Sequence, residues 1–411
     1  MTNPTNPRTL SGALTTSGTA AMVVGTLVAA VAAYAFQLVA GRVLGPEAFA
    51  PITVLWTIQF LVFTTVFVPM EQLTIRRLSA AVPESAPRRL FLSAIVVSVV
   101  ASVGFGAFTL DRLLDGNVIY LAVIMVVIAA YGSFALARGA LAGRRRFDDY
   151  GWSTMAESVV RLVVVLSLLA VGAGVVGVAW SLIPGALVVY LWKPFRGKAP
   201  STTPGPATGA GAALATFVVA NAASQTIVAA GPLVVGALGA SAAERSVFFE
   251  TFLLFRAPLT VAYSLIARVL PPFTRMAESD DRSMLARWSV RTGIAAGALG
   301  VAAFAVGHWI GPSLVALFLG EEYRPSADLA AYAAAGVVIA TAALFVQQML
   351  IALRTTGGLA AAWLGGLIAA GLTVALTSGE ASLRVGLGFL IGEAVALGLI
   401  VITVLAAAKK R

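Results

Sequence analysis

Long apolar runs recur from one end of this chain to the other, and they constrain its fold more than any other feature. Each run is roughly twenty residues long, which an α-helix needs to cross the hydrocarbon core of a bilayer. Of the 411 residues, 59% are hydrophobic and only 11% are charged, whereas a soluble domain carries about 25% charged residues. A membrane β-barrel would instead alternate over segments of about ten residues. The sequence therefore predicts an all-α, polytopic membrane protein.

Charged residues and Gly- or Pro-rich breaks divide the chain into twelve predicted membrane spans. Most of the 28 Lys and Arg residues lie in alternate loops and at the termini, which the positive-inside rule places in the cytoplasm. We therefore expect a cell-membrane protein with both termini in the cytoplasm and membrane lipids around it. The net charge of +10 follows from this distribution and does not indicate a nucleic-acid partner. The predicted spans cover residues 18–40, 50–70, 89–110, 118–141, 152–173, 174–192, 211–238, 246–270, 288–310, 326–351, 357–377 and 384–407.

The loops between these spans differ in their basic residues. The predicted outer loops hold Arg42, Arg112, Arg245, Arg324 and Arg384. Arg161 and Arg256 fall inside spans, and the remaining basic residues, Arg138 and the run Arg144 to Arg146 among them, are assigned to inner loops.

One polar stretch interrupts the pattern after the sixth span. Residues 196–210 are rich in Pro, Gly and small polar residues, which prevent a helix and favour a linker. The predicted organisation is thus a six-span half at 1–195, a cytoplasmic linker at 196–210 and a second six-span half at 211–411. LVAGRVLG at the end of the first span is weakly similar to LVVGALG at the end of the seventh. Such a parallel repeat predicts a substrate path between the halves.

Three further motifs resemble one transporter family. They are AGRVLGPEAFAPITVLW from Ala40, GALAGRRRFDDYGWSTMAESVVRL from Gly139, and GPSLVALFLGEEYRPSADLAAYAA from Gly311. Their order and spacing are similar to those of polysaccharide and O-antigen flippases in the multidrug/oligosaccharidyl-lipid/polysaccharide exporter superfamily. The resemblance implies two six-helix bundles in a V-shape, related by a pseudo-twofold axis along the membrane normal. It also implies a lipid-linked saccharide as cargo and glycan-biosynthesis enzymes as partners.

Arg256 is the first candidate for a substrate-binding residue. It lies inside the eighth predicted span, two residues before Pro258. An Arg at mid-bilayer costs at least about 2.5 kcal/mol unless it faces a wet cavity or a partner. A guanidinium suits the phosphate or pyrophosphate of a lipid carrier. The alternative is a structural bond to Glu250 or to a backbone carbonyl.

Other polar residues at membrane depth are weaker candidates for substrate binding. Glu157 and Arg161 lie four residues apart and so share a helix face, which favours a structural ion pair over a phosphate site at Arg161. Gln59, Asn221 and Gln225 are expected to form helix–helix hydrogen bonds, or to contact sugar hydroxyls if they line the cavity.

Glu250 and Glu393 are candidates for coupling transport to an ion gradient. Burial favours the protonated form of a carboxyl group, which proton coupling requires. Each could instead be a neutral, hydrogen-bonded group, and Glu250 is near enough to the outer end of its span to be wet.

The sequence lacks the motifs or residues that several other classes of protein require. There is no GxxxxGK[ST] phosphate loop, so transport is driven by an ion gradient or runs downhill. The chain has no cysteine, and its one histidine, His308, is expected at the membrane interface and not in a metal site. We expect no cofactor and no enzymatic activity. A glycosyltransferase or polymerase would depend on Asp111 and Asp115, or on Asp280 and Asp281. A multidrug/cation antiporter of the same superfamily is the nearer alternative, although the seventh span has no carboxylate.

Overall fold

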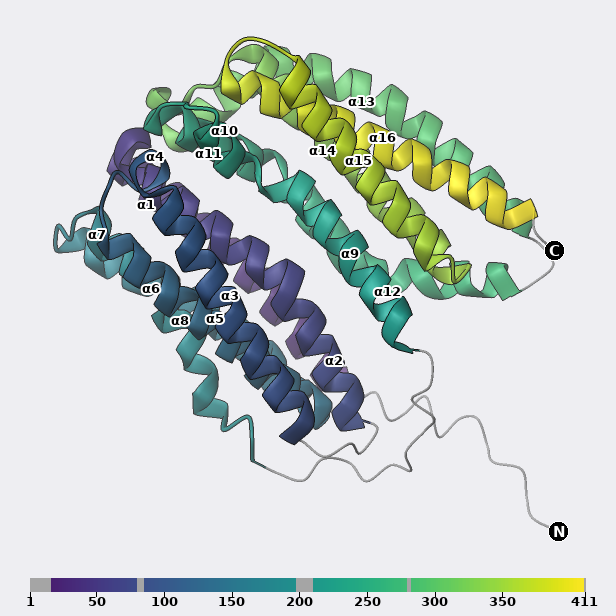
Figure 1. The fold of residues 1–411 in the computed structure, drawn as a ribbon, viewed down its shortest axis with the longest axis horizontal. Helices are drawn as coiled ribbons and strands as arrows, with labels where there is room; N and C mark the ends of the chain where they lie inside the picture. Colours follow the sequence, from purple (N-terminus) through teal and green to yellow (C-terminus); the bar gives the residue numbers. More distant parts are fainter. Residues whose placement is uncertain (1–15, 80–84, 197–209, 279–281, 410–411) are drawn as a thin grey trace. The chain divides into compact units, whose positions relative to one another are not determined.

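The computed structural model describes residues 16–79, 85–196, 210–278 and 282–409. Within these ranges every regular element is a helix, as the sequence predicts (Figure 1). Each of the twelve predicted spans coincides with one helix, part of one helix, or a group of consecutive short helices. The protein is therefore a multi-pass membrane protein of the all-α class.

The first span and most of the second share the element α1 (Thr16–Val62), 47 residues that form two helices on either side of a kink. At about 1.5 Å per residue the two helices together measure about 70 Å along their axes, more than twice the hydrocarbon thickness. Gly45 interrupts the element with φ 76° and ψ 164°, a conformation that favours glycine, and Pro46 follows. The element is thus two spans joined at Gly45. The second span ends through a π-helical turn (Phe63–Phe67) and α2 (Val68–Ser79).

The next spans are α3 (Ser85–Phe108), α5 (Ile119–Gly143) and α6 (Phe147–Ala170), with the one-turn helix α4 (Leu110–Leu113) between α3 and α5. The sixth span is a series of short pieces: α7 (Val175–Trp180), α8 (Pro184–Leu187) and a 3₁₀ turn (Val188–Trp192).

The seventh and eighth spans are both broken. α9 (Ala210–Ala229) and α10 (Gly231–Ala237) meet at Ala230, and the described part of this pair bends by 62°. α11 (Ala242–Phe255) and α12 (Ala257–Glu278) meet at Arg256. The remaining elements are α13 (Arg282–Leu319), a 3₁₀ turn (Glu321–Tyr323), α14 (Ala327–Ala352), α15 (Thr356–Leu376) and α16 (Ala381–Lys409).

By length and apolar composition, nine helices of the described residues can each cross a membrane. One of them, Ala21–Ile75, has 55 residues and contains two spans, and the bent pair α9–α10 adds another.

Contacts divide the chain into two compact units. Unit 1 lies within Met1–Gln37, Phe67–Ala101 and Met125–Pro206, and unit 2 within Leu38–Val66, Ser102–Ile124 and Ala207–Arg411. Unit 2 therefore takes two segments from the first half of the sequence, which the predicted boundary at 196–210 does not anticipate. Apart from its first and last residues, that predicted linker lies outside the described residues. The V-shaped arrangement stays a prediction.

Small residues let the helices within each unit approach closely. In unit 1, a Cβ atom on Gly25 would come within 2.3 Å of the carbonyl oxygen of Gly151, so α1 and α6 cross with their backbones in contact. In unit 2, a Cβ atom on Gly366 would lie 2.6 Å from the carbonyl oxygen of Gly392, where α15 crosses α16. α14 is rich in Ala, and most of its residues are buried.

Candidate functional site

In unit 1, Glu157 and Arg161 form the ion pair that their spacing predicts. The Arg161 Nη1 atom lies 3.1 Å from Glu157 Oε1, and both residues are buried. Arg161 also donates a 2.6 Å hydrogen bond to the Tyr131 hydroxyl, which in turn donates to Glu157. Ser158 donates to the second carboxylate oxygen at 2.6 Å. Arg161 is thus held in a network of its own unit, which favours the structural interpretation.

A second network in unit 1 was not expected from the sequence. Arg138 was assigned to an inner loop, but it lies within α5 with 13% of its side chain exposed. Its guanidinium is 3.2 Å from Glu71 Oε1 and donates to the Tyr150 hydroxyl, which donates to Glu71 at 2.9 Å. The assignment to a loop was wrong. Glu71 on another helix pairs with this Arg, so its charge can lie within a helix. Glu71, a carboxylate beside the end of an apolar run, was the available signal.

The run of arginines from Arg144 to Arg146 also has structural contacts. Arg144 is buried and donates to the Ala140 carbonyl at 3.1 Å. Arg146 donates to the carbonyls of Trp192 at 2.6 Å and Lys193 at 3.1 Å, and so binds the end of the sixth span. Arg146 therefore joins the start of α6 to the end of the sixth span within unit 1, whereas the bond of Arg144 lies within its own helix end.

In unit 2, Arg256 lies where the broken seventh and eighth spans meet. It forms the C-cap of α11, and its Nη1 atom donates to the Val228 carbonyl, in the last turn of α9, at 2.9 Å. Its Nε atom is 3.2 Å from the Phe252 carbonyl oxygen. The last carbonyls of a helix have no partner within the helix, so the Arg256 side chain supplies a donor at the end of α9, while the Phe252 carbonyl also accepts the backbone N–H of Arg256. The expected alternative of a backbone bond is confirmed, and no ion pair to Glu250 occurs among the described residues.

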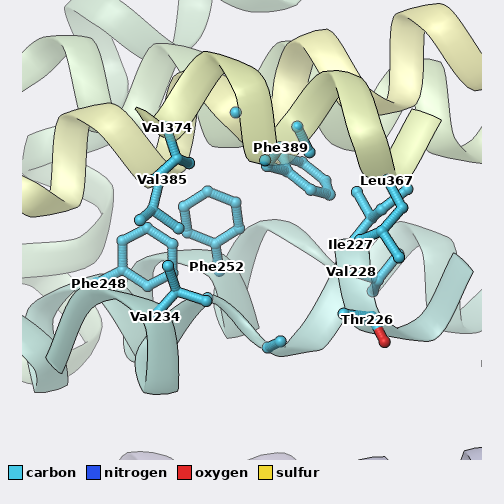
Figure 2. Close-up of a pocket in the computed structure, with 15 residues that line it drawn as sticks. Thr226, Ile227, Val228, Val234, Phe248, Phe252, Leu367, Val374, Val385 and Phe389 are labelled. Atoms are coloured by element: carbon cyan, nitrogen blue, oxygen red, sulfur yellow. The ribbon is translucent and has the colours of Figure 1, made fainter. Parts of the chain in front are cut away.

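Two apolar hollows flank Arg256 within unit 2. Val228 and Phe252, which accept its hydrogen bonds, also line a cavity of about 170 Å³ between the bend of α9–α10, α11, α15 and α16 (Figure 2). Its neighbours Phe255 and Pro258 line a groove of about 460 Å³ with α13 and α14. Arg256 itself lines neither space, but its chain neighbours and the residues that accept its hydrogen bonds do.

Glu393 is completely buried in the middle of α16. It lines a cavity of about 10 Å³ together with Ser224, Gln347 and Trp363, which is room for about one water molecule. Trp363 donates to Gln347 at 2.9 Å. Neither carboxyl oxygen of Glu393 has a hydrogen-bond partner among the residues that the structure describes. A buried carboxyl beside a water-sized space can hold a proton or a hydrated group.

Glu250 is also completely buried, in α11. The alternative that it is wet is wrong, because the segment around Gly41 and the turn before α14 lie against it. A Cβ atom on Gly41 would lie 3.4 Å from Glu250 Oε1 and 3.3 Å from the Tyr323 hydroxyl. Within the described ranges, neither oxygen of Glu250 has a hydrogen-bond partner.

Two of the motifs noted in the sequence contact each other beside Glu250. Tyr323 donates a 2.9 Å hydrogen bond to the Gly41 carbonyl. Arg42 donates to the Phe318 carbonyl at 3.0 Å, near the end of α13. Tyr323 is buried, and burial together with Glu250 and Glu322 raises the pKa of its hydroxyl above the ordinary value. It therefore remains a neutral donor.

The three amide candidates do not all have the same role. Asn221 donates to the Thr64 carbonyl at 2.8 Å and so joins α9 to the π-helical turn, as expected for a helix–helix bond. Gln59 and Gln225 are buried.

The other residues singled out in the sequence are one histidine and several aspartates. His308 Nδ1 lies 3.3 Å from Asp328 Oδ1, with 40% of its side chain exposed. The described residues contain no group of three or more metal-binding side chains. Asp115 lies 3.8 Å from Arg245, which donates to the Arg112 carbonyl at 2.6 Å. Asp280 and Asp281 lie outside the described residues.

No family model matches the sequence. An uncharacterized protein of Mycobacterium bovis is 25% identical over 398 residues, which cover 91% of this chain and 89% of that protein. A second uncharacterized protein, of Mycobacterium tuberculosis, is 25% identical over 258 residues, or 59% of this chain and 56% of its own length.

Solved structures of the same fold are transporters. An inward-facing multidrug resistance MATE family transporter of the MOP superfamily has a TM-score of 0.67 at 14% identity, covering 93% of this chain and 95% of its own. A eukaryotic MATE transporter has a TM-score of 0.61 at 13% identity, with 96% and 95% covered. A MOP superfamily transporter from Pyrococcus furiosus has a TM-score of 0.57 at 14% identity, with 96% and 94% covered, and reverse polarity of its binding pocket suggests a different function for it. The chain therefore has the fold of these transporters.

Proposed function

We propose that this protein is a secondary transporter that flips a lipid-linked oligosaccharide or polysaccharide precursor across the cell membrane by alternating access. The observation that carries the proposal is Arg256 at the junction of two broken spans, beside apolar hollows. Substrate sites of secondary transporters typically form at discontinuous helices near the bilayer midplane. A cation at such a junction suits the phosphate of a lipid carrier.

The physical problem for such a cargo is its headgroup. A charged pyrophosphate–sugar group loses its hydration in hydrocarbon, which costs many kcal/mol. A protein path that supplies a guanidinium and polar side chains removes much of this barrier. The lipid tail needs no such path, because it remains in an apolar environment throughout.

Glu250 and Glu393 are the proposed coupling groups. Both are buried carboxyls in unit 2 without a hydrogen-bond partner among the described residues. The sequence has no phosphate-binding loop for a nucleotide, so an ion gradient is the proposed energy source. A proton on either group would keep it neutral in its buried position.

The alternative is a multidrug/cation antiporter, which one observation favours. A solved structure with the same fold is a multidrug resistance MATE family transporter. Apolar hollows near the partly buried Arg256 would also suit a lipophilic drug. However, a cationic drug would be repelled by Arg256, and the seventh span supplies no carboxylate to attract it.

Reconstitution into liposomes distinguishes these functions. A fluorescent lipid-pyrophosphate saccharide is incorporated, and its movement between leaflets is followed with an impermeant quencher, while ethidium uptake is measured in parallel. We expect flipping of the saccharide lipid and no ethidium transport. Arg256→Gln should slow flipping by about tenfold, the value of one charge-assisted hydrogen bond, whereas the exposed Arg291→Gln should not. Ethidium transport without lipid flipping would establish the alternative.

A further inference from the structure

Unit 2 contains a contact between two segments that are far apart in the sequence. Tyr323 donates to the carbonyl of Gly41 at 2.9 Å, and Arg42 donates to the carbonyls of Phe318 at 3.0 Å and Leu317 at 3.3 Å. The first segment joins spans one and two, and the second joins α13 to α14. We refer to these three residues, Gly41, Arg42 and Tyr323, and the two carbonyls as the docking contact.

The docking contact leaves little room beside Gly41. A Cβ atom there would lie 3.3 Å from the Tyr323 hydroxyl, 3.4 Å from Glu250 Oε1 and 3.4 Å from Leu319. Two oxygens from different elements thus converge on the same face of Gly41. Glu250 is completely buried at this place, and Gly41 and Tyr323 of the docking contact are part of its surroundings.

The hydrogen-bond inventory at Glu250 favours its neutral form. The one hydroxyl proton of Tyr323 is used on the Gly41 carbonyl, so the Tyr323 oxygen presents only lone pairs to its surroundings. The nearest polar groups of the docking contact are therefore acceptors. A carboxylic acid can donate to an acceptor, whereas a carboxylate would be desolvated and repelled.

The charged groups on the elements next to Glu250 make their contacts with other partners. Arg42 is bonded to the end of α13, and Arg245 to the Arg112 carbonyl. Glu322 lies beside Gly45, since a Cβ atom there would be 3.3 Å from its carboxylate. Among the described residues, no ion pair to Glu250 offsets its burial.

We propose that Glu250 is a proton-binding site that controls the docking contact: the protonated acid keeps the two segments docked, and ionisation releases them. The docked form then binds one more proton than the released form, so docking strengthens as the pH falls. This inference deepens the coupling role proposed above for Glu250 and rests on it. Its test needs no cargo, so the two proposals can fail separately.

The chain has no cysteine, so a single introduced thiol can report on the contact. Ser246 is completely buried one turn before Glu250 on the same helix face, and its hydroxyl has no hydrogen-bond partner among the described residues. The reporter is S246C in the full chain, reconstituted in phosphatidylethanolamine–phosphatidylglycerol vesicles. Its reaction rate with an impermeant methanethiosulfonate is measured over a pH series. The intrinsic pH dependence of thiol reactivity is removed by dividing by the rate of A237C, which places a thiol at an exposed position.

We expect the rate ratio to rise with pH, by up to about tenfold per pH unit for one linked proton. With E250Q added, the ratio should stay low and independent of pH, because glutamine cannot ionise. With Y323F added, the ratio should rise about fivefold at every pH, the value of one hydrogen bond. E321Q, an exposed carboxyl in the same turn as Tyr323, and Y332F should each leave the pH profile unchanged.

A ratio that does not depend on pH, or the same pH dependence with and without E250Q, would overturn the proposal. If E250Q does not insert, the pH series of S246C and its response to Y323F still decide the outcome. Lipid flipping is then measured separately, and its absence would count against the proposed function and not against the docking contact.

Discussion

The Tyr323 hydroxyl donates a 2.9 Å hydrogen bond to the carbonyl oxygen of Gly41, which precedes it by 282 residues. Two short motifs that stand apart in the sequence are therefore partners in unit 2. The bond is buried, since Tyr323 is 1% exposed, and its loss would leave a buried carbonyl oxygen without this donor.

Replacing Tyr323 with phenylalanine should therefore destabilise unit 2. Leaving one buried acceptor unsatisfied costs about 1–3 kcal/mol. The expected result is a lower Tm in detergent, measured by the change in tryptophan fluorescence on heating. Tyr332→Phe is the matched control, because the described hydrogen bonds do not include one from its hydroxyl. Equal shifts for the two variants would show that the Gly41 bond does not contribute.

The network around Glu157 predicts a strongly non-additive pair of substitutions. Arg161→Leu removes the partner of a buried carboxylate and should cost about 3–5 kcal/mol. Adding Glu157→Leu should restore part of that stability, because no uncompensated charge then remains. The four proteins of this double-mutant cycle are compared by their free energies of unfolding. Additive losses would indicate that the two side chains do not act as a pair.

The crossing of α1 and α6 predicts a position that tolerates only glycine. A Cβ atom on Gly151 would lie 2.5 Å from the carbonyl oxygen of Ala21, so Gly151→Ala must separate the two backbones. We expect a large loss of folded protein, measured by monodisperse yield in size-exclusion chromatography. Gly104→Ala in α3 is the control, because no atom lies within 4 Å of the corresponding Cβ position. Exposed glycine-to-alanine changes in helices are neutral or stabilising by up to about 1 kcal/mol.

The burial of Glu393 predicts that its isostere preserves the fold and removes the coupling. Glutamine is neutral and of similar shape, so Glu393→Gln should change the free energy of unfolding by less than about 1 kcal/mol. Transport in liposomes should continue down a cargo gradient but no longer respond to an imposed pH gradient. Glu380→Gln, an exposed carboxyl, is the control. An unchanged response to the pH gradient in Glu393→Gln would remove Glu393 from the coupling mechanism.

The helical fold was predictable because each span must present enough apolar residues to the bilayer. The breaks in the seventh and eighth spans were less predictable. Gly231-Pro232 and Pro258 mark the neighbourhood of the two breaks, but the choice of Ala230 and Arg256 as the junctions depends on the carbonyls that Arg256 reaches. The sequence does not show which carbonyls lie within reach of Arg256, so a backbone bond was only one of two structural alternatives to substrate binding.

The buried networks could be predicted only where both partners lie on one helix. Glu157 and Arg161 are four residues apart, and their pairing follows from helix geometry. Glu71 and Arg138 are separated by 67 residues, so nothing local indicates that they meet. Arg138 then resembled the arginines that the positive-inside rule places in loops. A wet Glu250 remained one of the alternatives from the sequence, because the segment that lies against it comes from the first span, about 200 residues earlier.

Unit 2 is assembled from three separate stretches of the polypeptide, two of which precede the polar stretch at 196–210. A gene divided at that stretch would therefore encode two fragments, neither of which contains a complete unit 2. During synthesis, the residues from Leu38 to Val66 are inserted before Ala207–Arg411, so they can complete their packing in unit 2 only after that later segment has been inserted. Co-expression of the two fragments should thus be necessary to form a complete unit 2.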